Sequence, residues 1–537
     1  MIRLRSTLGW FGIVAFCAVY VAAEQVAPEF SFYSVKAFGA VGDGASKDTE
    51  AIQSAIDAAH DAGGGTVYFP AGVYLSGTLR LKSHVTLHLE AGSTLLGSTQ
   101  ADDFPSTPPR FRSYTEKYVH QSLLFGEDLE NVTLEGRGVI DGQGAAYKGL
   151  PYRKRPYIIR LVGCRTIRVR DITIRNSPMW VQHYLACDDL AIHGIHVESH
   201  VNANNDGINI DCCRNVRISD CFIHSGDDAI VLKSTGNRTT ENVTVTNCVL
   251  STICNAIKLG TESNGGFRNI TVSNCAVRKP GPEENWDRER RGLAAIALMI
   301  VDGGTLERVN ISDITVRGMG AAVFVRLGNR ARPYLPDGPK PDIGQVKDVM
   351  IRNVIASDIG PTGCSITGLP GHPVENVSLS DIRITFEGGG EKTDADREIP
   401  EVPEEYPEFN MFEGPLPAYG FYSRHVQGLR LSNIDLTWEK PDARSALFCE
   451  DVEDLELDRF SGRCLPDGLP MMVLKDVRRA LIRGCLVPED TNVFLRLQGE
   501  TKQVSVIGND LSLAETPFEF TDGTPTSGFY SVNNREK

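Results

Sequence analysis

Three short segments of this chain place acidic or amide side chains where turns are expected. The segments are Asn204–Ile208, Ser225–Ile230 and Cys254–Leu259. When they are aligned on the small and apolar residues that follow, Asp206, Asp228 and Asn255 take equivalent positions, and Asp227 lies beside Asp228. Aspartate is common in solvated turns, but a turn that needs only hydrogen bonding does not need three acids. Carboxylates buried together repel one another, so at least one of them should keep its proton to a higher pH.

Such a cluster suits the hydrolysis of a glycosidic bond. In that reaction one carboxylic acid protonates the leaving oxygen while a carboxylate activates water, and inversion needs about 6.5–9.5 Å between the two groups. If the segments lie on neighbouring parallel strands, a rise of about 4.8 Å plus the diagonal offset from Asp206 to Asp227 gives a compatible separation. The chemistry therefore requires an element that holds the three segments side by side.

A repeated motif supplies that element. It consists of alternating apolar residues around an Asp or Asn followed by Ile or Cys, and it returns about every 25 residues, which is typical of a solenoid. Apolar spacing of two excludes helical repeats, and the consensus of leucine-rich repeats is absent. The motif predicts an all-β parallel β-helix of roughly 12 or 13 coils. Its clear copies are Ile167–Ile174, Leu190–Val197, Val216–Ile223, Val243–Leu250, Ile270–Val277, Val309–Val316, Val349–Ala356, Val377–Ile384 and Leu429–Leu436.

Three cysteines are placed by the same motif. Cys221, Cys248 and Cys275 follow one another at intervals of 27 residues, each after an Asp or Asn. We expect them to stack in consecutive coils as small buried residues, an arrangement that permits a disulfide between coils without favouring it.

The coil stack also needs an end and loops. We expect residues 24–100 to form an N-terminal capping region and residues 101–537 to form the β-helix. In the cap, Asp48 or Thr49 should cap a helix whose apolar face is Ile52, Ala55, Ile56 and Ala59. Strands should follow at Thr66–Phe69 and Val85–Leu89. Three insertions make their coils longer than the average coil and should leave the stack as loops, which we expect to wall a groove. They are Pro280–Gly292, Arg330–Gln345 and Glu387–Tyr419.

Residues 1–23 read as a signal peptide. They contain Arg3 and Arg5, an apolar stretch over Leu8–Tyr20, and small residues at Val21–Ala23. This predicts a secreted protein, extracellular or periplasmic; a retained membrane anchor is the alternative, and no later stretch is apolar enough to span a bilayer. We expect a monomer. We also expect no cofactor, because the cysteines follow the repeat rather than a zinc spacing.

The net charge of −14, which becomes −16 without the two arginines, argues against nucleic acid as a partner. It does not exclude an acidic substrate, because a local basic cleft can lie on an acidic protein.

The motifs resemble the polygalacturonase family of pectin hydrolases, glycoside hydrolase family 28. The resemblance runs from Phe38–Gly44 through Asn176–Trp180 to the acidic motifs at Asn204–Gly207 and Gly226–Asp228. It implies a right-handed parallel β-helix, a pectic polysaccharide or oligosaccharide as substrate, and hydrolysis with inversion.

By the same resemblance, Asp227 is the general acid, and Asp206 and Asp228 hold the water as base. Two features depart from the family. The Gly-His-Gly motif should fall near Ile253–Asn255, which has no histidine, and the Arg-x-Lys motif near Ala294–Leu298, which has no basic residue. Candidate substrate-binding residues are Lys258, Arg326, Lys233, His183, Asn255 and His200, for which a solvated surface charge or an ordinary turn residue is the alternative.

The first hypothesis is therefore a secreted inverting glycosidase that acts on galacturonate- or rhamnogalacturonan-containing polymers, with endo and exo action both open. The alternatives are a carbohydrate-binding β-helix without turnover and a polysaccharide lyase on the same fold. Binding alone does not need a proton-sharing acid cluster. A lyase usually needs a calcium cage and a basic residue, and no further clustered carboxylates are apparent.

Overall fold

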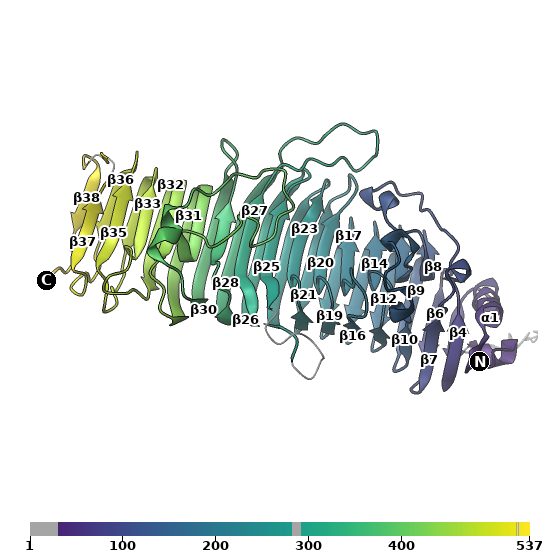
Figure 1. Ribbon diagram of the computed structural model, residues 1–537. Coiled ribbons are helices and arrows are strands. Elements are labelled where there is room, and N and C mark those ends of the chain that lie inside the picture. Colours follow the sequence, from purple (N-terminus) through teal and green to yellow (C-terminus); the bar gives the residue numbers. More distant parts are fainter. Residues whose placement is uncertain (1–30, 282–290, 522, 525) are drawn as a thin grey trace, which may run out of the picture.

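The computed structural model describes residues 31–281, 291–521, 523–524 and 526–537. The expected signal peptide at residues 1–23 and most of the expected loop at Pro280–Gly292 lie outside the described residues. Within the described chain, the labelled strands pair in parallel, each with the equivalent strand of the coil before and the coil after. The coils form one elongated stack with the two chain ends at opposite ends (Figure 1). The predicted parallel β-helix is confirmed, and no described helix is long and apolar enough to cross a membrane.

The strands form three parallel sheets around the axis of the stack. The first sheet contains β1 (Phe32–Ser34), β3 (Gly65–Phe69), β6 (Val85–Leu89), β9 (Glu130–Gly136), β12 (Arg165–Arg170), β15 (Asp188–His193), β18 (Arg214–Ser219) and β21 (Thr240–Thr246). The second contains β2 (Asp43–Lys47), β4 (Gly72–Ser76), β7 (Ser93–Gly97), β10 (Val139–Asp141), β13 (Thr173–Arg175), β16 (His196–Ser199), β19 (Phe222–Ser225) and β22 (Val249–Thr252). The third contains β5 (Leu79–Arg80), β8 (Ser122–Glu127), β11 (Tyr157–Val162), β14 (Gln182–Leu185), β17 (Ile208–Asp211), β20 (Ile230–Ser234), β23 (Ile257–Ser263), β25 (Gly292–Ile300), β27 (Met319–Leu327) and β29 (Cys364–Thr367).

In later coils, single long strands pass through more than one sheet. The first and second sheets are joined by β24 (Phe267–Arg278), β26 (Thr305–Arg317), β28 (Gln345–Ile359) and β30 (Val374–Gly388), and all three by β31 (Ala418–Lys440) and β32 (Ser445–Gly462). The stack ends with β33 (Met472–Lys475), β34 (Arg478–Arg483), β35 (Val493–Gln498), β36 (Lys502–Ile507), β37 (Thr516–Phe520) and β38 (Phe529–Val532).

The core consists of columns with one apolar residue per coil. The first residue of each motif copy pairs with its equivalent in the next coil, as in Ile167, Leu190 and Val216, and these side chains are buried. Burial of each such side chain is worth about 1.5–3 kcal/mol. The strand register also places Cys221, Cys248 and Cys275 in consecutive coils, buried and with free thiols.

The Asp or Asn of the motif occupies the turn between the first and second sheets. Asp220, Asn247 and Asn274 adopt positive φ angles of 59°, 56° and 53°. Aspartate and asparagine tolerate this left-handed conformation better than other residues that carry a Cβ. The recurrence of these two residue types therefore follows from the backbone that each coil needs at this corner.

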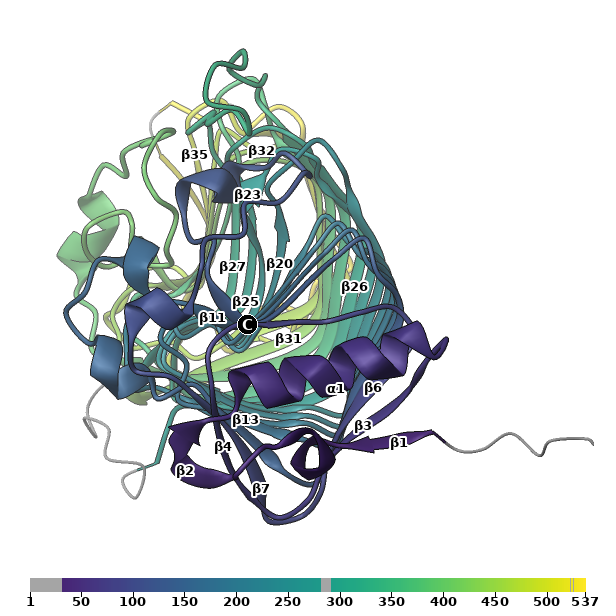
Figure 2. The same cartoon turned by 90° about the vertical axis from the view of Figure 1, so that its right-hand side faces the viewer.

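One helix covers the N-terminal end of the stack. Helix α1 (Thr49–Asp61) lies across the open end of the first coils (Figure 2) and buries the predicted apolar face, Ile52, Ala55, Ile56 and Ala59. The Asp48 carboxylate does not cap the helix; it accepts hydrogen bonds from the backbone N–H groups of Val41 and Gly42. Because β3, β4, β6 and β7 pair with later coils, the solenoid begins inside the region expected as a cap.

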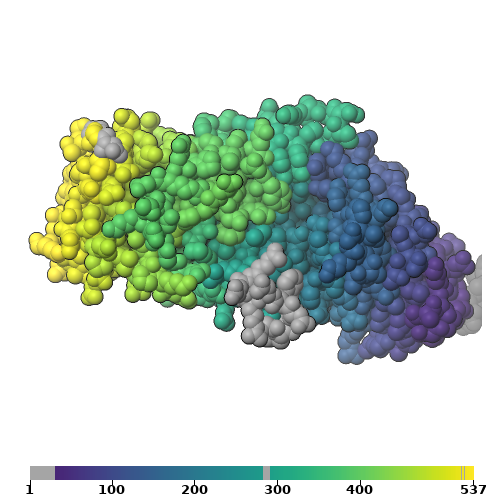
Figure 3. Space-filling view, in the orientation of Figure 1, coloured from purple at the N-terminus to yellow at the C-terminus, as the bar shows by residue number. Residues whose placement is uncertain are grey.

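The long connections gather on one side of the stack, next to the third sheet (Figure 2). They contain η2 (Ala101–Asp103), η3 (Tyr114–Lys117), η4 (Gly144–Tyr147), η5 (Tyr152–Lys154) and η7 (Lys392–Asp396), whereas η1 (Val35–Phe38) lies at the capped end. In the space-filling view, the green surface of residues 387–419 and the blue surface of the earlier coils lie on either side of a teal strip (Figure 3). These loops therefore frame part of the third sheet.

Candidate active site

The strand register brings the three acidic segments together. Ile208 pairs with Ile230, and Ile230 with Ile257, so Asp206, Asp228 and Asn255 occupy one column immediately before β17, β20 and β23. The column is also joined by hydrogen bonds, because the Asn255 backbone N–H and Nδ2 donate to Asp228 Oδ1 at 3.2 and 2.9 Å. The predicted alignment of these side chains on successive coils is confirmed.

The column opens into a cavity of about 250 Å³. Asp206, Asp227 and Asp228 line it together with Lys233 and Lys258. Asp206 and Asp228 are buried, whereas Asp227 is half-buried. The three carboxylates thus share one cavity with two ammonium groups.

Neighbouring charges separate the protonation behaviour of the three buried or half-buried acids. Burial and the charge of Asp227 raise the pKa of Asp206, and burial and the charge of Asp228 raise the pKa of Asp227. Burial also acts to raise the pKa of Asp228, but the nearby Lys258 and Lys233 ammonium groups outweigh it and lower that pKa. The cluster therefore holds an ionised carboxylate at Asp228 beside carboxyl groups that keep a proton to higher pH.

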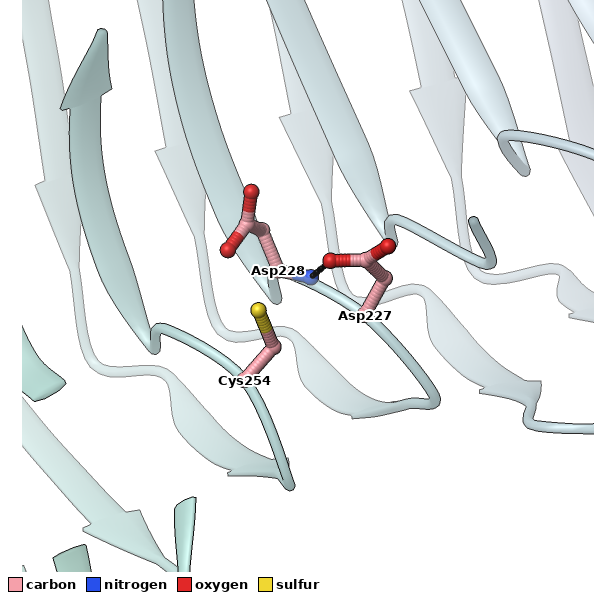
Figure 4. A group of neighbouring side chains, drawn as sticks. All are labelled: Asp227, Asp228 and Cys254. Atoms are coloured by element: carbon pink, nitrogen blue, oxygen red, sulfur yellow. Dashed lines mark hydrogen bonds between the residues drawn. The ribbon is translucent and has the colours of Figure 1, made fainter. Parts of the chain in front are cut away.

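Asp227 and Asp228 are held by the turn between β19 and β20 (Figure 4). The Asp228 backbone N–H donates to Asp227 Oδ1 at 3.0 Å. The Asp227 carbonyl oxygen accepts hydrogen bonds from Ser225 Oγ at 2.8 Å and from Thr252 Oγ1 of the next coil at 2.6 Å. Cys254, also from the next coil, points its thiol toward both carboxyl groups, with all three ligand atoms within 4.8 Å of one another. One backbone N–H therefore holds the Asp227 carboxyl group, and hydroxyl groups from two coils hold the Asp227 backbone.

The ammonium groups of the two lysines lie next to buried carboxylates. Lys258 Nζ lies 2.6 Å from Asp228 Oδ2 and donates to the Tyr406 hydroxyl at 3.2 Å. Lys233 Nζ donates to Glu262 Oε2 at 3.3 Å, and it lies 3.8 Å from Asp206 Oδ2. Burial alone would lower the pKa of both ammonium groups, but the adjacent carboxylates raise it, so both stay charged.

Four of the expected substrate-binding residues lie outside the cavity lining: Asn255, which donates to Asp228 instead, His183, His200 and Arg326. His183 is fully buried below Trp180, with ring centroids 5.2 Å apart, and its Nε2 lies 3.0 Å from Asp211 Oδ2. The rings of His200 and of His224 in the next coil are tilted against each other, with centroids 4.7 Å apart. Neither histidine lines the cavity.

Arg326 also lies elsewhere than expected. It is on the third sheet, but further along the stack, and it is buried under the insertion at residues 387–419. Its guanidinium donates to Thr367 Oγ1 and to the carbonyl oxygens of Gly368 and Val402. These hydrogen bonds join the insertion at residues 387–419 to the strands of the stack. We therefore assign Arg326 to loop attachment rather than to the groove.

Several residues of the cavity wall were not expected from the sequence. Tyr118, Glu262, Arg332 and Tyr406 line the cavity, and Trp180 contributes an aromatic face below Lys233, 4.7 Å from its Nζ. Arg332 and Tyr406 come from two of the three insertions that were expected to wall a groove. Loop residues carry no periodic signal, so their position could not be read from the repeat.

Among the described residues, Asp227, Asp228 and Cys254 form the group whose donor atoms are close enough to hold a metal ion. However, Lys258 lies 2.6 Å from Asp228, where its positive charge would oppose a bound cation. The arrangement fits a proton-sharing cluster better than a metal site.

Comparison with known proteins gives consistent results. The family described as "Glycosyl hydrolases family 28" matches residues 62–404. A Vitis vinifera protein named "Probable polygalacturonase" is 38% identical over 212 residues, which are 37% of this chain and 43% of the relative. The "Exo-poly-alpha-D-galacturonosidase" of Dickeya chrysanthemi is 28% identical over 250 residues, which are 37% and 41% of the two chains. The matches thus span less than half the length of these curated relatives.

The fold has a counterpart among solved structures. The hyperthermoactive exopolygalacturonase from Thermotoga maritima superposes with a TM-score of 0.58 at 22% identity, covering 76% of this chain and 92% of that chain. A likeness at this identity shows the fold.

Proposed function

This chain belongs to glycosyl hydrolases family 28, and from that premise we propose that it is a secreted enzyme that hydrolyses glycosidic bonds in pectic polysaccharides or oligosaccharides with inversion. The observation that carries the proposal is the column of Asp206, Asp228 and Asn255 beside Asp227, in which the pKa values of neighbouring carboxyl groups are driven apart. Such separation assigns an acid and a base to one site.

In the proposed reaction, Asp227 is the general acid. Its raised pKa keeps a proton available, and it transfers this proton to the glycosidic oxygen as the bond to the anomeric carbon breaks. Asp228 is held ionised by Lys258 and Asn255, and it takes a proton from the water that attacks the anomeric carbon from the opposite face. Asp206, from the preceding coil, completes the water site.

The shape of the cavity supports action at a chain end. Its volume of about 250 Å³ lies below the range of about 300–1,000 Å³ usual for ligand pockets. Tyr118 and Tyr406 bound it from segments on either side of the catalytic coils, which favours one terminal sugar over a chain passing through. Two of the relatives named above are exo-acting by name, which agrees with this proposal.

A single assay distinguishes the candidate functions. The purified protein is incubated with oligogalacturonides and with rhamnogalacturonan oligosaccharides, and reducing ends, ultraviolet absorbance and product masses are recorded. We expect new reducing ends, loss of single terminal sugars and no absorbance from an unsaturated product. Absorbance from an unsaturated product would favour the lyase, and binding without any product would favour the carbohydrate-binding module. Proton NMR of the first product anomer tests inversion.

Secretion is part of the proposal and is supported by the pattern of residues 1–23. Expression of the full chain, followed by N-terminal sequencing of the exported protein, tests it: the mature chain should begin after Ala23.

A further inference from the structure

Glu262 is a buried carboxylate in the cavity wall that the proposed mechanism does not use. Its side chain is 8% exposed, and it lies on β23 in the coil after Asp228. The register between β20 and β23 shifts just before it, because Leu232 pairs with Leu259 whereas Ser234 pairs with Ser263. Such bulges re-aim side chains and are common next to active sites. The shift accounts for an acid that enters the cavity outside the catalytic column.

The partners of Glu262 leave one of its oxygens incompletely used. Oε1 accepts from Arg332 at 3.0 Å, from the Tyr118 hydroxyl at 3.4 Å and from Thr261 Oγ1 at 3.5 Å, so its two lone pairs are fully used. Oε2 accepts from Lys233 at 3.3 Å, and no other hydrogen bond reaches it from the described residues. One acceptor position therefore remains on Oε2.

Lys233, in turn, has hydrogen-bond donors that Glu262 does not use. An ammonium group has three donors, and one of them is used by Glu262. Asp206 Oδ2, at 3.8 Å, attracts the charge but lies beyond direct hydrogen-bond distance. Both side chains line the cavity, and Trp180 lies under the ammonium group. The wall thus offers a donor and an acceptor next to each other above an aromatic ring.

We propose that Lys233 and Glu262 together bind two adjacent hydroxyl groups of the sugar in the cavity, so that this part of the wall reads a vicinal diol. One hydroxyl donates to Glu262 Oε2 and the neighbouring hydroxyl accepts from Lys233 Nζ. The inference rests on the proposed function only in that the cavity takes a sugar. It makes Glu262 a specificity-determining residue.

The charge of Glu262 sets the chemical class that fits. Burial acts to raise the pKa of Glu262, but Lys233 and Arg332 lower it well below its ordinary value, so the carboxylate is ionised. An anionic group placed against Oε2 would meet this charge in a buried site, where like charges interact strongly. A substrate carboxylate must therefore point away from Glu262, and the sugar face toward Glu262 must be neutral and hydroxylated.

The variant Glu262→Gln tests the pair. Glu450→Gln is the matched control, because Glu450 lies on the same sheet next to a lysine, an arginine and a tyrosine, namely Lys475, Arg424 and Tyr422, but outside the cavity. The substrates are an oligosaccharide that the wild type cleaves and its analogues that lack one hydroxyl at position 2, 3 or 4 of the terminal sugar.

We expect the wild type and Glu450→Gln to prefer the parent over at least one deoxy analogue by about 100-fold or more in kcat/KM, since a site that pairs with a hydroxyl rejects a substrate without it. Glu262→Gln should lower kcat/KM for the parent and reduce that preference to less than about tenfold. Lys233→Met, the second variant, should lose the preference for the hydroxyl adjacent to the one that Glu262 binds. Unchanged preferences in both folded variants would overturn the assignment.

A binding measurement separates this inference from the proposed function. If the wild type cleaves none of the oligosaccharides, the hydrolase proposal fails, and calorimetric titration with the same parent and deoxy sugars decides the diol assignment by itself. Loss of the parent's binding advantage in Glu262→Gln but not in Glu450→Gln supports the assignment. Equal advantages in the two variants overturn it.

Discussion

Replacement of Lys258 by methionine removes one partner of the buried ion pair that holds Asp228. The two groups are 2.6 Å apart, and their side chains are 5% and 3% exposed. Methionine fills a similar volume without charge, so the change leaves Asp228 as an uncompensated buried carboxylate. Breaking such a pair costs about 3–5 kcal/mol of unfolding free energy.

The protonation of Asp228 sets an upper bound to that cost. From an ordinary Asp pKa of about 3.9, protonating the group at pH 7 costs about 4 kcal/mol at 1.36 kcal/mol per pKa unit. In the wild type the pKa of Asp228 is lowered, so its contribution to stability is present above the unfolded-state pKa and is lost as pH falls through the folded-state pKa. In Lys258→Met the folded-state pKa is raised instead, and stability is lost as pH rises. The difference between the two proteins should therefore widen by up to about 1.4 kcal/mol per unit from pH 5 to pH 7.

Urea unfolding of both proteins at pH 5, 6 and 7, followed by intrinsic fluorescence, measures this difference. The control is Lys475→Met, which removes a 2.8 Å ion pair with Glu450 on the same sheet where the two side chains are 43% and 21% exposed. Its effect should stay below about 1 kcal/mol and vary little with pH. A Lys258→Met deficit that is independent of pH, or no larger than the control's, would refute the view that Lys258 keeps Asp228 ionised. Loss of the base should also lower kcat by about 10²–10⁴-fold.

Three further predictions concern the acid, its neighbour and the loop that closes the cavity. Asp227→Asn should lose most turnover while its unfolding free energy stays within about 1 kcal/mol of the wild type, because it removes a proton donor and little packing; activity within tenfold of the wild type would contradict the assignment. Hydrogen bonding from the Cys254 thiol is one of the influences that lower the pKa of Asp227, so Cys254→Ala should move the alkaline limb of the kcat/KM profile to higher pH, and Cys254→Ser should restore it; coincident profiles would exclude this contact. Arg444 forms a fully buried ion pair with Asp442 and donates to the carbonyl oxygens of residues 361 and 416. Arg444→Met should therefore raise KM and expose residues 387–419 to limited proteolysis. An unchanged cleavage pattern would show that other contacts hold the insertion.

The catalytic column could be predicted from the sequence because its geometry depends on local pairing alone. The period of the motif sets the register of neighbouring coils, and the register places Asp206, Asp228 and Asn255 in line. The same period identified the stacked cysteines and the apolar columns. Each coil rises by one interstrand distance, so these residues have little freedom to lie anywhere else.

The rest of the wall depends on features that interrupt the period. Glu262 follows a register shift inside β23, and Arg332 and Tyr406 reach the cavity from insertions whose paths no repeat describes. Arg326 lies on β27 of the third sheet, but the insertion that covers it lies far along the sequence and could not be placed. His183 likewise projects from the third sheet, and Trp180 closes the space above it.

The two tyrosines that bound the cavity come from coils that lie far apart along the stack. Tyr118 precedes β8 and contacts Glu262, whereas Tyr406 precedes β31 and contacts Lys258. Nine successive strand pairings separate β8 from β31 in the described chain, or about 43 Å at about 4.8 Å per pairing. Both tyrosines nevertheless contact side chains of β23, so the two loops reach back to one coil from opposite directions along the stack. The coil that carries Lys258 and Glu262 therefore joins loops that belong to distant coils, and a change in either loop reaches the cavity through one tyrosine hydroxyl group.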